Sequence, residues 1–315
     1  MFVALLRKIK WSLYLPFLAY LKSILPFPKK IKKPVCFIVG CGRSGTTILG
    51  KLISKHKDVL YLNEPVHYWY AINKKTDYTD IFGRKNGKCF LDENDASKRE
   101  IKKFNRLFGK KILFSRKKIL IEKLPINSFR IRFLLKLNSK AKIIHIIRDG
   151  RAVVQSIKKI SEDNKYKIFR LPLNLWWGRN NYKWKTLSKE AKNKKYFSAK
   201  PDKLETFSDY GAFEWITSIE EVDNMKKIIP KEQFLEIIYE DLIKNPEIIM
   251  NKILSFLNLS SYSKYNNIVK QMVYSKEREN NKIFLSKDII KPFKKLQLKL
   301  KYPVSSVELN AEIKK

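Results

Sequence analysis

The sequence has few cysteines and few acidic residues. Its 315 residues include three cysteines, Cys36, Cys41 and Cys89, which are too few and too unevenly spaced for a disulfide framework or a zinc site. Acidic residues number 30 against 67 lysines and arginines, so the formal net charge is +37. The scarcity of cysteine favours a reducing compartment, and we expect a cytoplasmic protein, with a luminal protein that keeps unpaired thiols as the alternative.

The positive charge predicts attraction to polyanions such as nucleic acid, anionic lipid, acidic glycan or a phosphorylated cofactor. The alternative is that the surplus is only compositional, because the basic residues are spread along the whole chain in pairs between apolar positions. No signature of a nucleic-acid-binding fold is present, so we expect no nucleic-acid partner. An apolar content of 44% supports a folded protein with a substantial core.

The N-terminal segment, residues 1–32, is apolar and basic but lacks a long hydrophobic run. Its longest uncharged stretch, from Trp11 to Leu21, is shorter than the roughly 20 residues that a membrane-spanning helix needs. It also lacks a small-residue cleavage signature. We therefore expect residues 1–30 to form an amphipathic helix in peripheral contact with a membrane surface. Packing onto the domain and a true anchor, with the active site in a lumen, are the alternatives.

After residue 32, β-branched apolar runs alternate with helical periodicity, which is typical of βαβ units. This pattern predicts the α/β class: a P-loop-like three-layer sandwich around a central, mostly parallel sheet. The predicted strands cover residues 35–40, 118–124, 141–150 and 234–242, and the predicted helices cover residues 46–55, 127–137, 151–160 and 245–259. We expect one domain over residues 33–300, a tail over residues 301–315, and a variable loop or lid over residues 161–212.

The sequence GCGRSGTT at residues 40–47 follows the first predicted strand. A strand, a glycine-containing loop and a helix N-terminus together form an anion site, because unpaired N–H groups and the helix dipole face the loop. The stretch is almost a P-loop, but Thr46 occupies the position of the lysine and the nearest cation is Arg43. Thr46 and Thr47 supply hydroxyl donors. Since the magnesium-binding context is also missing, we expect no metal.

The sequence IIRDGRAVVQS at residues 146–156 marks a second strand end. Arg148 stands at the carboxyl end of a predicted parallel strand, where doubly wound sheets bind ligands, and Ser156 is two turns along the next helix. These two side chains suit a second phosphate, although Asp149 as a helix cap explains part of the motif alone. Two anion sites without a γ-phosphate site indicate 3′-phosphoadenosine 5′-phosphosulfate (PAPS).

Together with IIYEDLIKNP at residues 237–246, these motifs resemble the PAPS-dependent sulfotransferases, above all the protein-tyrosine and carbohydrate branch. The resemblance covers most of residues 35–260. It implies that a sulfuryl group moves from PAPS to an acceptor hydroxyl and leaves 3′-phosphoadenosine 5′-phosphate (PAP). The implied cofactor-binding residues are Gly42, Arg43, Ser44, Gly45, Thr46, Thr47, Arg148 and Ser156, with Lys282 as a further contact.

The resemblance also implies a catalytic carboxylate. Glu64 lies at the family's spacing from Arg43 and would take the proton of the acceptor, while Lys123 matches a lysine that steadies the transferring sulfonate. Arg43 fills a cationic place that other branches give to lysine. His67 is the rival base. Sulfuryl transfer is an in-line displacement through a loose transition state, so these residues would act by positioning, charge stabilisation and proton removal.

The acceptor is less determined by the sequence. Trp176, Trp177 and Trp184 suit stacking on sugar rings, and they suit a hydrophobic core equally well. A glycan or glycolipid is the leading expectation, with protein tyrosine, other lipids and small hydroxyl compounds as alternatives. Two other functions stand beside sulfotransfer. A P-loop kinase or NTPase would need a lysine at Thr46, and a non-enzymatic protein binding nucleic acid or anionic membrane would leave residues 40–47 unexplained.

Overall fold

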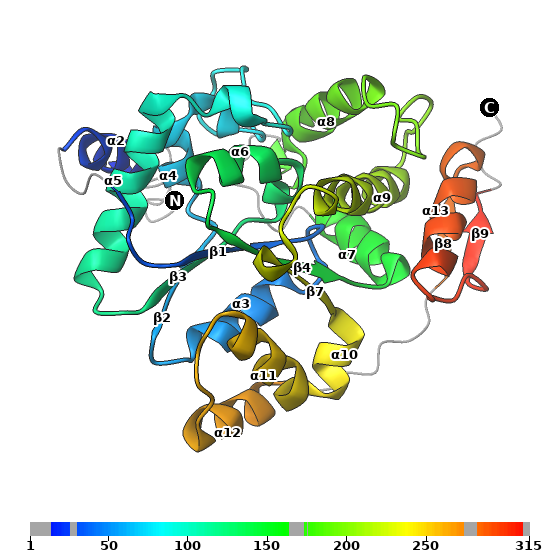
Figure 1. Ribbon diagram of the computed structural model, residues 1–315. Coiled ribbons are helices and arrows are strands. Elements are labelled where there is room, and N and C mark those ends of the chain that lie inside the picture. The colour runs from blue at the N-terminus through cyan, green and yellow to red at the C-terminus, as the bar shows by residue number, and fades with distance from the viewer. Residues whose placement is uncertain (1–13, 26–29, 164–172, 175, 274–281, 311–315) are drawn as a thin grey trace.

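A five-stranded parallel sheet forms the centre of the protein, in the strand order β2-β3-β1-β4-β7 (Figure 1). The computed structural model describes residues 14–25, 30–163, 173–174, 176–273 and 282–310. The strands of the sheet are β1 (Val35–Val39), β2 (Val59–Asn63), β3 (Ile119–Lys123), β4 (Lys142–Ile147) and β7 (Phe234–Ile238). The predicted α/β class with a central parallel sheet is confirmed.

Helices cover both faces of the sheet and complete the three layers (Figure 1). On one face lie α3 (Thr46–Ser54), α10 (Tyr239–Lys244), α11 (Pro246–Phe256) and α12 (Ser263–Met272). On the other face lie α4 (Val66–Ile72), α5 (Lys98–Phe114), α6 (Ile131–Leu137), α7 (Gly150–Glu162), α8 (Tyr182–Lys192) and α9 (Phe207–Lys226). Short 3-10 helices span Lys74–Thr76, Glu93–Asp95, Pro125–Phe129 and Lys231–Gln233.

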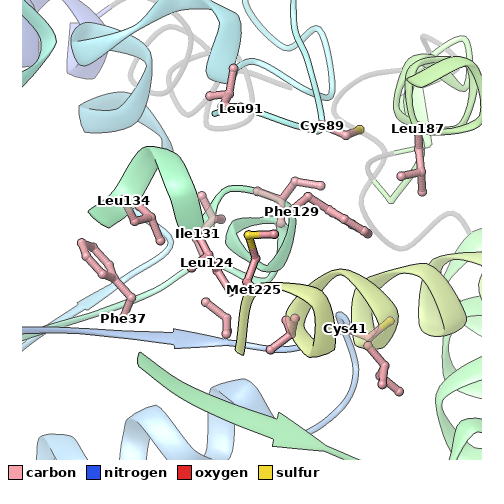
Figure 2. Packing of buried hydrophobic residues seen from close by; sticks show 14 of the residues in the cluster. Phe37, Cys41, Cys89, Leu91, Leu124, Phe129, Ile131, Leu134, Leu187 and Met225 are labelled. Atoms are coloured by element: carbon pink, nitrogen blue, oxygen red, sulfur yellow. The ribbon is translucent and has the colours of Figure 1, made fainter. Parts of the chain in front are cut away.

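Strand β1 contributes to two separate cores. Phe37 and its neighbours two residues away belong to the core under α4 to α9, whereas Cys36 and Ile38 belong to the core under α3, α11 and α12. Figure 2 shows part of the first core, where Phe37, Leu134 and Met225 lie around the same apolar space. A parallel strand covered on both faces reads as a continuous apolar run, which explains why the sequence alone locates β1.

The N-terminal helix α2 (Leu15–Ile24) packs on α4 and α5. Ala19 is buried in this contact. Arg106 Nη1 on α5 donates to the carbonyl oxygens of Ser23 and Ile24, at 3.0 Å each, and so caps the end of α2. This part of the N-terminal segment is attached to the domain, while residues 1–13 lie outside the described residues. None of the helices in the described ranges combines the length and the apolar character needed to span a bilayer.

Several predicted boundaries are wrong. The fourth strand ends at Ile238, and residues 239–244 form α10 because the β-branched run stops at Tyr239. Within residues 161–212, which we expected to be a loop or lid, α7 continues to Glu162, α8 is a full helix and α9 begins at Phe207. The short strands β5 (Leu173–Asn174) and β6 (Gly178–Arg179) also pair there.

The C-terminal part of the chain adds a helix and two strands. Helix α13 (Lys287–Lys299) lies between β8 (Ile283–Leu285) and β9 (Val307–Leu309), which pair in parallel. Val307 is buried against the first core. The division of the chain at residues 32 and 300 stays a prediction, but residues 307–309 are held by strand pairing rather than extending as a free tail.

Candidate active site

The loop over residues 40–47 closes at the carboxyl end of β1. Gly45 has a φ of +93°, and a Cβ atom built there would lie 2.2 Å from Cδ2 of Tyr239, so only glycine fits. Gly45 is also the N-cap of α3 and offers no side-chain cap. The first N–H groups of α3 therefore lack helical acceptors, and the helix dipole adds positive potential at the loop. The loop therefore has the geometry that an anion site needs, and anion binding by it stays a prediction.

The side chains of this loop divide into buried and outward-facing ones. Ser44 and Thr46 are buried within the loop. Arg43 and Thr47 are exposed and line cavities. Arg43 has a φ of +72°, an unusual conformation for a residue with a Cβ atom, and such strain is typical of functional loops.

Arg148 and Ser156 lie next to this loop, as the sequence predicted for a shared ligand. Arg148 Nη1 donates to the carbonyl oxygen of Arg43 at 3.0 Å, and its guanidinium lies 4.3 Å from the ring centroid of Tyr239. Arg43 Nε donates to Ser156 Oγ at 2.9 Å. The two motifs, more than 100 residues apart in the chain, therefore form one continuous polar surface.

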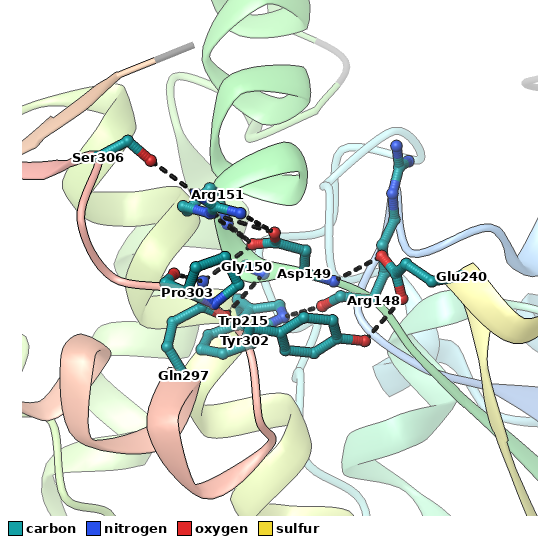
Figure 3. A network of polar contacts seen from close by, with 10 residues as sticks. All are labelled: Arg148, Asp149, Gly150, Arg151, Trp215, Glu240, Gln297, Tyr302, Pro303 and Ser306. Atoms are coloured by element: carbon teal, nitrogen blue, oxygen red, sulfur yellow. Dashed lines mark hydrogen bonds and ion pairs between the residues drawn. The ribbon is translucent and has the colours of Figure 1, made fainter. Parts of the chain in front are cut away.

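A polar network fixes the backbone around Arg148 (Figure 3). Trp215 Nε1 donates to the Arg148 carbonyl oxygen at 3.0 Å. Asp149 caps α7 by accepting from the backbone N–H of Arg151 at 2.9 Å, and the Arg151 guanidinium pairs with the same carboxylate at 2.7 Å. Gln297 Nε2 on α13 donates to Asp149 Oδ1 at 2.9 Å. Hydrogen bonds from α7, α9 and α13 therefore fix the end of β4 next to Arg148.

A cavity of about 760 Å³ opens beside this surface. Arg43, Ser156, Lys159 and Lys282 are among its lining residues. Lys282 is exposed and pairs with Glu308 at 2.8 Å, and the hydrogen bond and charge of that carboxylate raise the pKa of Lys282. Our sequence reasoning missed Lys159, although helical periodicity offers the signal, since Lys159 lies three residues after Ser156 on the same face of α7.

Glu64 and Lys123 meet at the ends of the neighbouring strands β2 and β3. Lys123 Nζ lies 2.5 Å from Glu64 Oε1 and 2.9 Å from Thr47 Oγ1. The Lys123 side chain is fully buried, whereas that of Glu64 is 45% exposed. The Glu64 backbone has a φ of +48°, and its N–H donates to the Lys123 carbonyl oxygen at 2.8 Å. The ends of β2 and β3 and the start of α3 thus place the Lys123 ammonium in contact with the Glu64 carboxylate and the Thr47 hydroxyl.

A second cavity, of about 500 Å³, opens onto this cluster. Glu64, Thr47 and Arg43 lie on its polar side. Apolar and aromatic side chains make up most of its other walls, together with the polar side chains of Asn63, Thr76, Asp77 and Thr79; the apolar and aromatic ones are Val66, Trp69, Tyr78, Ile81, Phe82, Leu124, Pro125, Ile126 and Trp176. Arg43 lines both cavities, so its guanidinium lies where the two meet.

Two buried ionic side chains, Lys183 and Glu214, line the apolar cavity, and no sequence motif predicted them. Lys183 on α8 and Glu214 on α9 both line it and form an ion pair at 2.7 Å. Lys183 Nζ also lies 4.4 Å from the ring centroid of Trp176. Behind the wall, Trp69 Nε1 donates to Glu122 Oε1 at 2.7 Å, and burial raises the pKa of Glu122 to about 8.

The three tryptophans of residues 176–184 have different surroundings. Trp177 and Trp184 are buried in the core. Trp176 lines the apolar cavity and packs on the loop at residues 40–47, which we call the anion loop. A Cβ atom built on Gly42 of this loop would lie 2.2 Å from Cη2 of Trp176. The stacking expectation therefore falls on Trp176, while the other two are structural.

His67, the rival base, is on α4 but is not among the described residues that line the cavity of Glu64. Burial, together with the positive charges of Lys111 and Lys22, lowers the pKa of His67 to about 4. Lys22 belongs to α2 and Lys111 to α5, so the charges that act on His67 come from these two helices and not from the cluster of Glu64 and Lys123. Within the ranges that the structure describes, no group of three or more His, Cys, Asp or Glu residues is arranged to hold a metal ion.

The fold and the site define a parallel α/β protein that combines an anion loop at a strand end with a carboxylate and lysine at the neighbouring strand ends. The family model described as "Sulfotransferase family" matches residues 34–197 and 189–264. The chain belongs to the sulfotransferase family.

Two mycobacterial proteins, from Mycobacterium bovis and Mycobacterium tuberculosis, are similar in sequence, and each is named omega-hydroxy-beta-dihydromenaquinone-9 sulfotransferase. Each is 24% identical over 282 residues, which is 75% of this chain and 65% of the relative. The match thus spans just under two thirds of the length of these relatives.

Two solved structures show the same fold. The sulfotransferase domain of the Synechococcus olefin synthase has a TM-score of 0.52 at 16% identity and covers 89% of this chain and 98% of its own. A sulfotransferase from Mycobacterium avium has a TM-score of 0.52 at 12% identity, and the match covers 90% of this chain and 79% of the Mycobacterium avium chain.

Proposed function

We propose that this chain transfers a sulfuryl group from PAPS to an acceptor hydroxyl by in-line displacement. The observation that carries the proposal is the position of Arg43, which lines both cavities. On one side it bonds to Ser156, and on the other it shares a cavity with Glu64 and Thr47. An arginine at this junction suits a negatively charged group that passes from one ligand to another.

The larger cavity fits a nucleotide with two separate anionic groups. The amides of residues 42–47 and the N-terminus of α3 would bind the 5′-phosphosulfate. Ser156 in the wall of this cavity would bind the 3′-phosphate together with Arg148, which lies behind Arg43 and bonds to its carbonyl oxygen, while Lys159 and Lys282 add positive charge to the cavity. PAPS supplies an activated sulfuryl group whose leaving group is a phosphate, and PAP is what the cavity would hold afterwards.

The cluster at β2 and β3 suits the chemical step. Glu64 would accept the proton of the acceptor hydroxyl as the acceptor oxygen bonds to sulfur and the bond from sulfur to the phosphate oxygen breaks. Lys123 and Arg43 would stabilise the charge that moves to the departing phosphate. Because Lys123 is buried and bonded to both Thr47 and Glu64, its ammonium is positioned before the ligands bind.

The mainly apolar walls of the smaller cavity favour an acceptor that carries its hydroxyl on a hydrophobic ring or chain. The mycobacterial relatives are named for a menaquinone-derived lipid, which supports a lipid acceptor for this chain as well. A glycolipid, which the sequence reasoning favoured together with free glycans, is one form of such an acceptor. Stacking on Trp176 would suit either a quinone ring or a sugar ring.

We also propose a cytoplasmic location with peripheral membrane contact. The three cysteines are free and buried, which suits a reducing compartment. Washing membranes with high salt would release a protein held by its lysines, whereas release by detergent alone would favour an anchored, luminal protein.

The function is tested by incubating the protein with radiolabelled PAPS and lipid extracts of its host. We expect label in an organic-soluble product with the unaltered protein and almost none with Glu64→Gln. PAP should also raise the melting temperature more than ATP with magnesium does, because ligand binding to the folded state stabilises it. Equal stabilisation by ATP, abolished by EDTA, would instead support a P-loop kinase.

A further inference from the structure

One end of the molecule carries most of the exposed apolar side chains of the described residues. Eight of the fourteen large hydrophobic side chains that are exposed lie on α2 and its ends or at the end of α5: Tyr14, Phe17, Tyr20, Leu21, Ile24, Leu25, Leu113 and Phe114. Phe114 is the most exposed of the fourteen, at 75%. We call this surface the α2–α5 face. A patch of this kind on a soluble domain indicates an interaction site.

A groove of about 540 Å³ lies between α2 and α5, which lie side by side at one end of the molecule (Figure 1). Two of the eight exposed apolar side chains line it: Leu25, the residue after α2, and Phe114, the last residue of α5. Lys22, Lys110 and Lys111 also line it, so the groove combines an apolar surface with a basic rim.

On the other side of α2 lies a basic cavity of about 650 Å³. It is lined by Tyr20 and Ile24 together with six cations, Lys74, Lys75, Arg99, Lys102, Lys103 and Arg106. Lys75 is paired with Asp95 and Arg99 with Glu100. Across the sequences of α2 and α5 there are eight basic residues against one acidic residue, Glu100, which is buried.

The occupant that suits this face is an anionic lipid surface. Exposed aromatic and aliphatic side chains enter the boundary between headgroups and acyl chains, while lysines and arginines around them meet the lipid phosphates. A second copy of the chain would bring two sets of uncompensated positive charges together. Nucleic acid would satisfy the charges but would leave Phe17, Leu21 and Phe114 without an apolar partner.

The α2–α5 face is also close to the proposed acceptor cavity. Residues 73–75, which follow α4, line the basic cavity, and residues 76–79 line the apolar cavity that contains Glu64. Helix α4 itself packs on α2 and carries Val66 and Trp69 of the acceptor cavity. A single stretch of chain therefore separates the two surfaces.

We propose that the α2–α5 face docks the protein on anionic membranes and so brings the acceptor cavity to a lipid-borne hydroxyl. The second half of this statement rests on the proposed function, whereas the docking itself does not. Docking predicts binding that depends on both the apolar side chains and the surrounding cations, and that weakens as salt screens the charges.

The test is co-sedimentation of the full chain with vesicles of phosphatidylcholine alone or mixed with phosphatidylglycerol. The test variant is Lys110→Glu with Phe114→Asp. The matched control is Lys252→Glu with Ile248→Asp, because Ile248 is also a highly exposed side chain, at 68%, four residues from a lysine, but lies on α11 across the sheet. We expect the unaltered protein and the control to bind the anionic vesicles, and the test variant to bind at least about tenfold more weakly.

The melting temperature of both variants without ligand checks that the domain is folded, and stabilisation by PAP separately checks the nucleotide cavity. Equal binding to neutral and anionic vesicles, or unchanged binding of the test variant, would overturn the proposal. If the test variant lost binding to a short DNA duplex but kept its binding to vesicles, the α2–α5 face would be assigned to nucleic acid, and the proposal would also be overturned. Vesicle binding is measured without donor or acceptor, so it can succeed even if sulfotransfer is not found.

Discussion

Replacing Glu64 with glutamine tests the centre of the proposed mechanism. The substitution keeps the size of the side chain and one oxygen that can accept from Lys123 Nζ, now 2.5 Å from Glu64 Oε1. It removes the negative charge and the ability to accept a proton from the acceptor. Glutamine and glutamate have the same backbone preferences, so we expect no new strain at the φ of +48° that Glu64 adopts.

The structure separates the effect on rate from the effect on stability. Loss of a general base lowers turnover by about 10²-fold or more, which corresponds to about 3 kcal/mol in the activation barrier. The stability cost should be smaller, about 1 kcal/mol, because the Glu64 side chain is 45% exposed and Lys123 keeps Thr47 as a second partner. Binding of PAP should be unchanged, since the residues proposed to bind it, 42–47, 148 and 156, are not altered.

The assay measures single-turnover transfer from radiolabelled PAPS, with the melting temperature in the presence of PAP as a check on folding and nucleotide binding. His67→Asn is the matched control, because His67 follows closely on the same segment but is not among the described residues that line the cavity of Glu64. We expect the control to remain active. A fully active Glu64→Gln protein together with an inactive His67→Asn protein would refute the assignment of the base while leaving the family membership intact.

Three further predictions follow from the same geometry. Arg43→Ala should lower both the rate and the stabilisation by PAP, because Arg43 lines both cavities and bonds to Ser156; loss of rate alone would place Arg43 away from the nucleotide. Gly45→Ala should lower the free energy of unfolding by about 2 kcal/mol or more in urea titrations, because the new Cβ atom would lie 2.2 Å from Tyr239 Cδ2; unchanged stability would contradict this packing. The His67 pKa of about 4 lies below its ordinary value of 6.5, so its neutral form stabilises the fold above pH 6.5 and this stability is lost as the pH falls toward 4. In urea titrations, the free energy of unfolding should fall less between pH 6.5 and pH 4 for His67→Asn than for the unaltered protein, by about 1–2 kcal/mol after allowance for solvent screening. Identical pH profiles of the two proteins would contradict the burial of His67.

Much of the fold and of the anion sites could be predicted from the sequence, because these features are local. β1, β3 and β4 are apolar runs buried on both faces, and such runs stand out without knowledge of their neighbours. The glycines of the loop at residues 40–47 are likewise a local signal, since Gly40 and Gly45 have φ values of +147° and +93°, whereas the approach of Tyr239 to Gly45 is a tertiary contact that the sequence does not show. The apolar residues of β7 also predict a strand. The end of β7 could not be predicted, because no glycine or proline separates it from α10.

Only the tertiary structure decided which side chains share a space. Arg43 meets Ser156 across 113 positions of sequence, and Lys183 meets Glu214 across 31. Hydrophobic periodicity shows which face of a helix is buried, but it does not show what lies opposite that face. For this reason the sequence could not separate Trp176, at the cavity, from Trp177, in the core, or show that His67 is not among the described residues that line the cavity of Glu64. The sequence determines the strands and the anion loop through local backbone chemistry, whereas the two cavities and the α2–α5 face arise from the packing of helices onto the sheet.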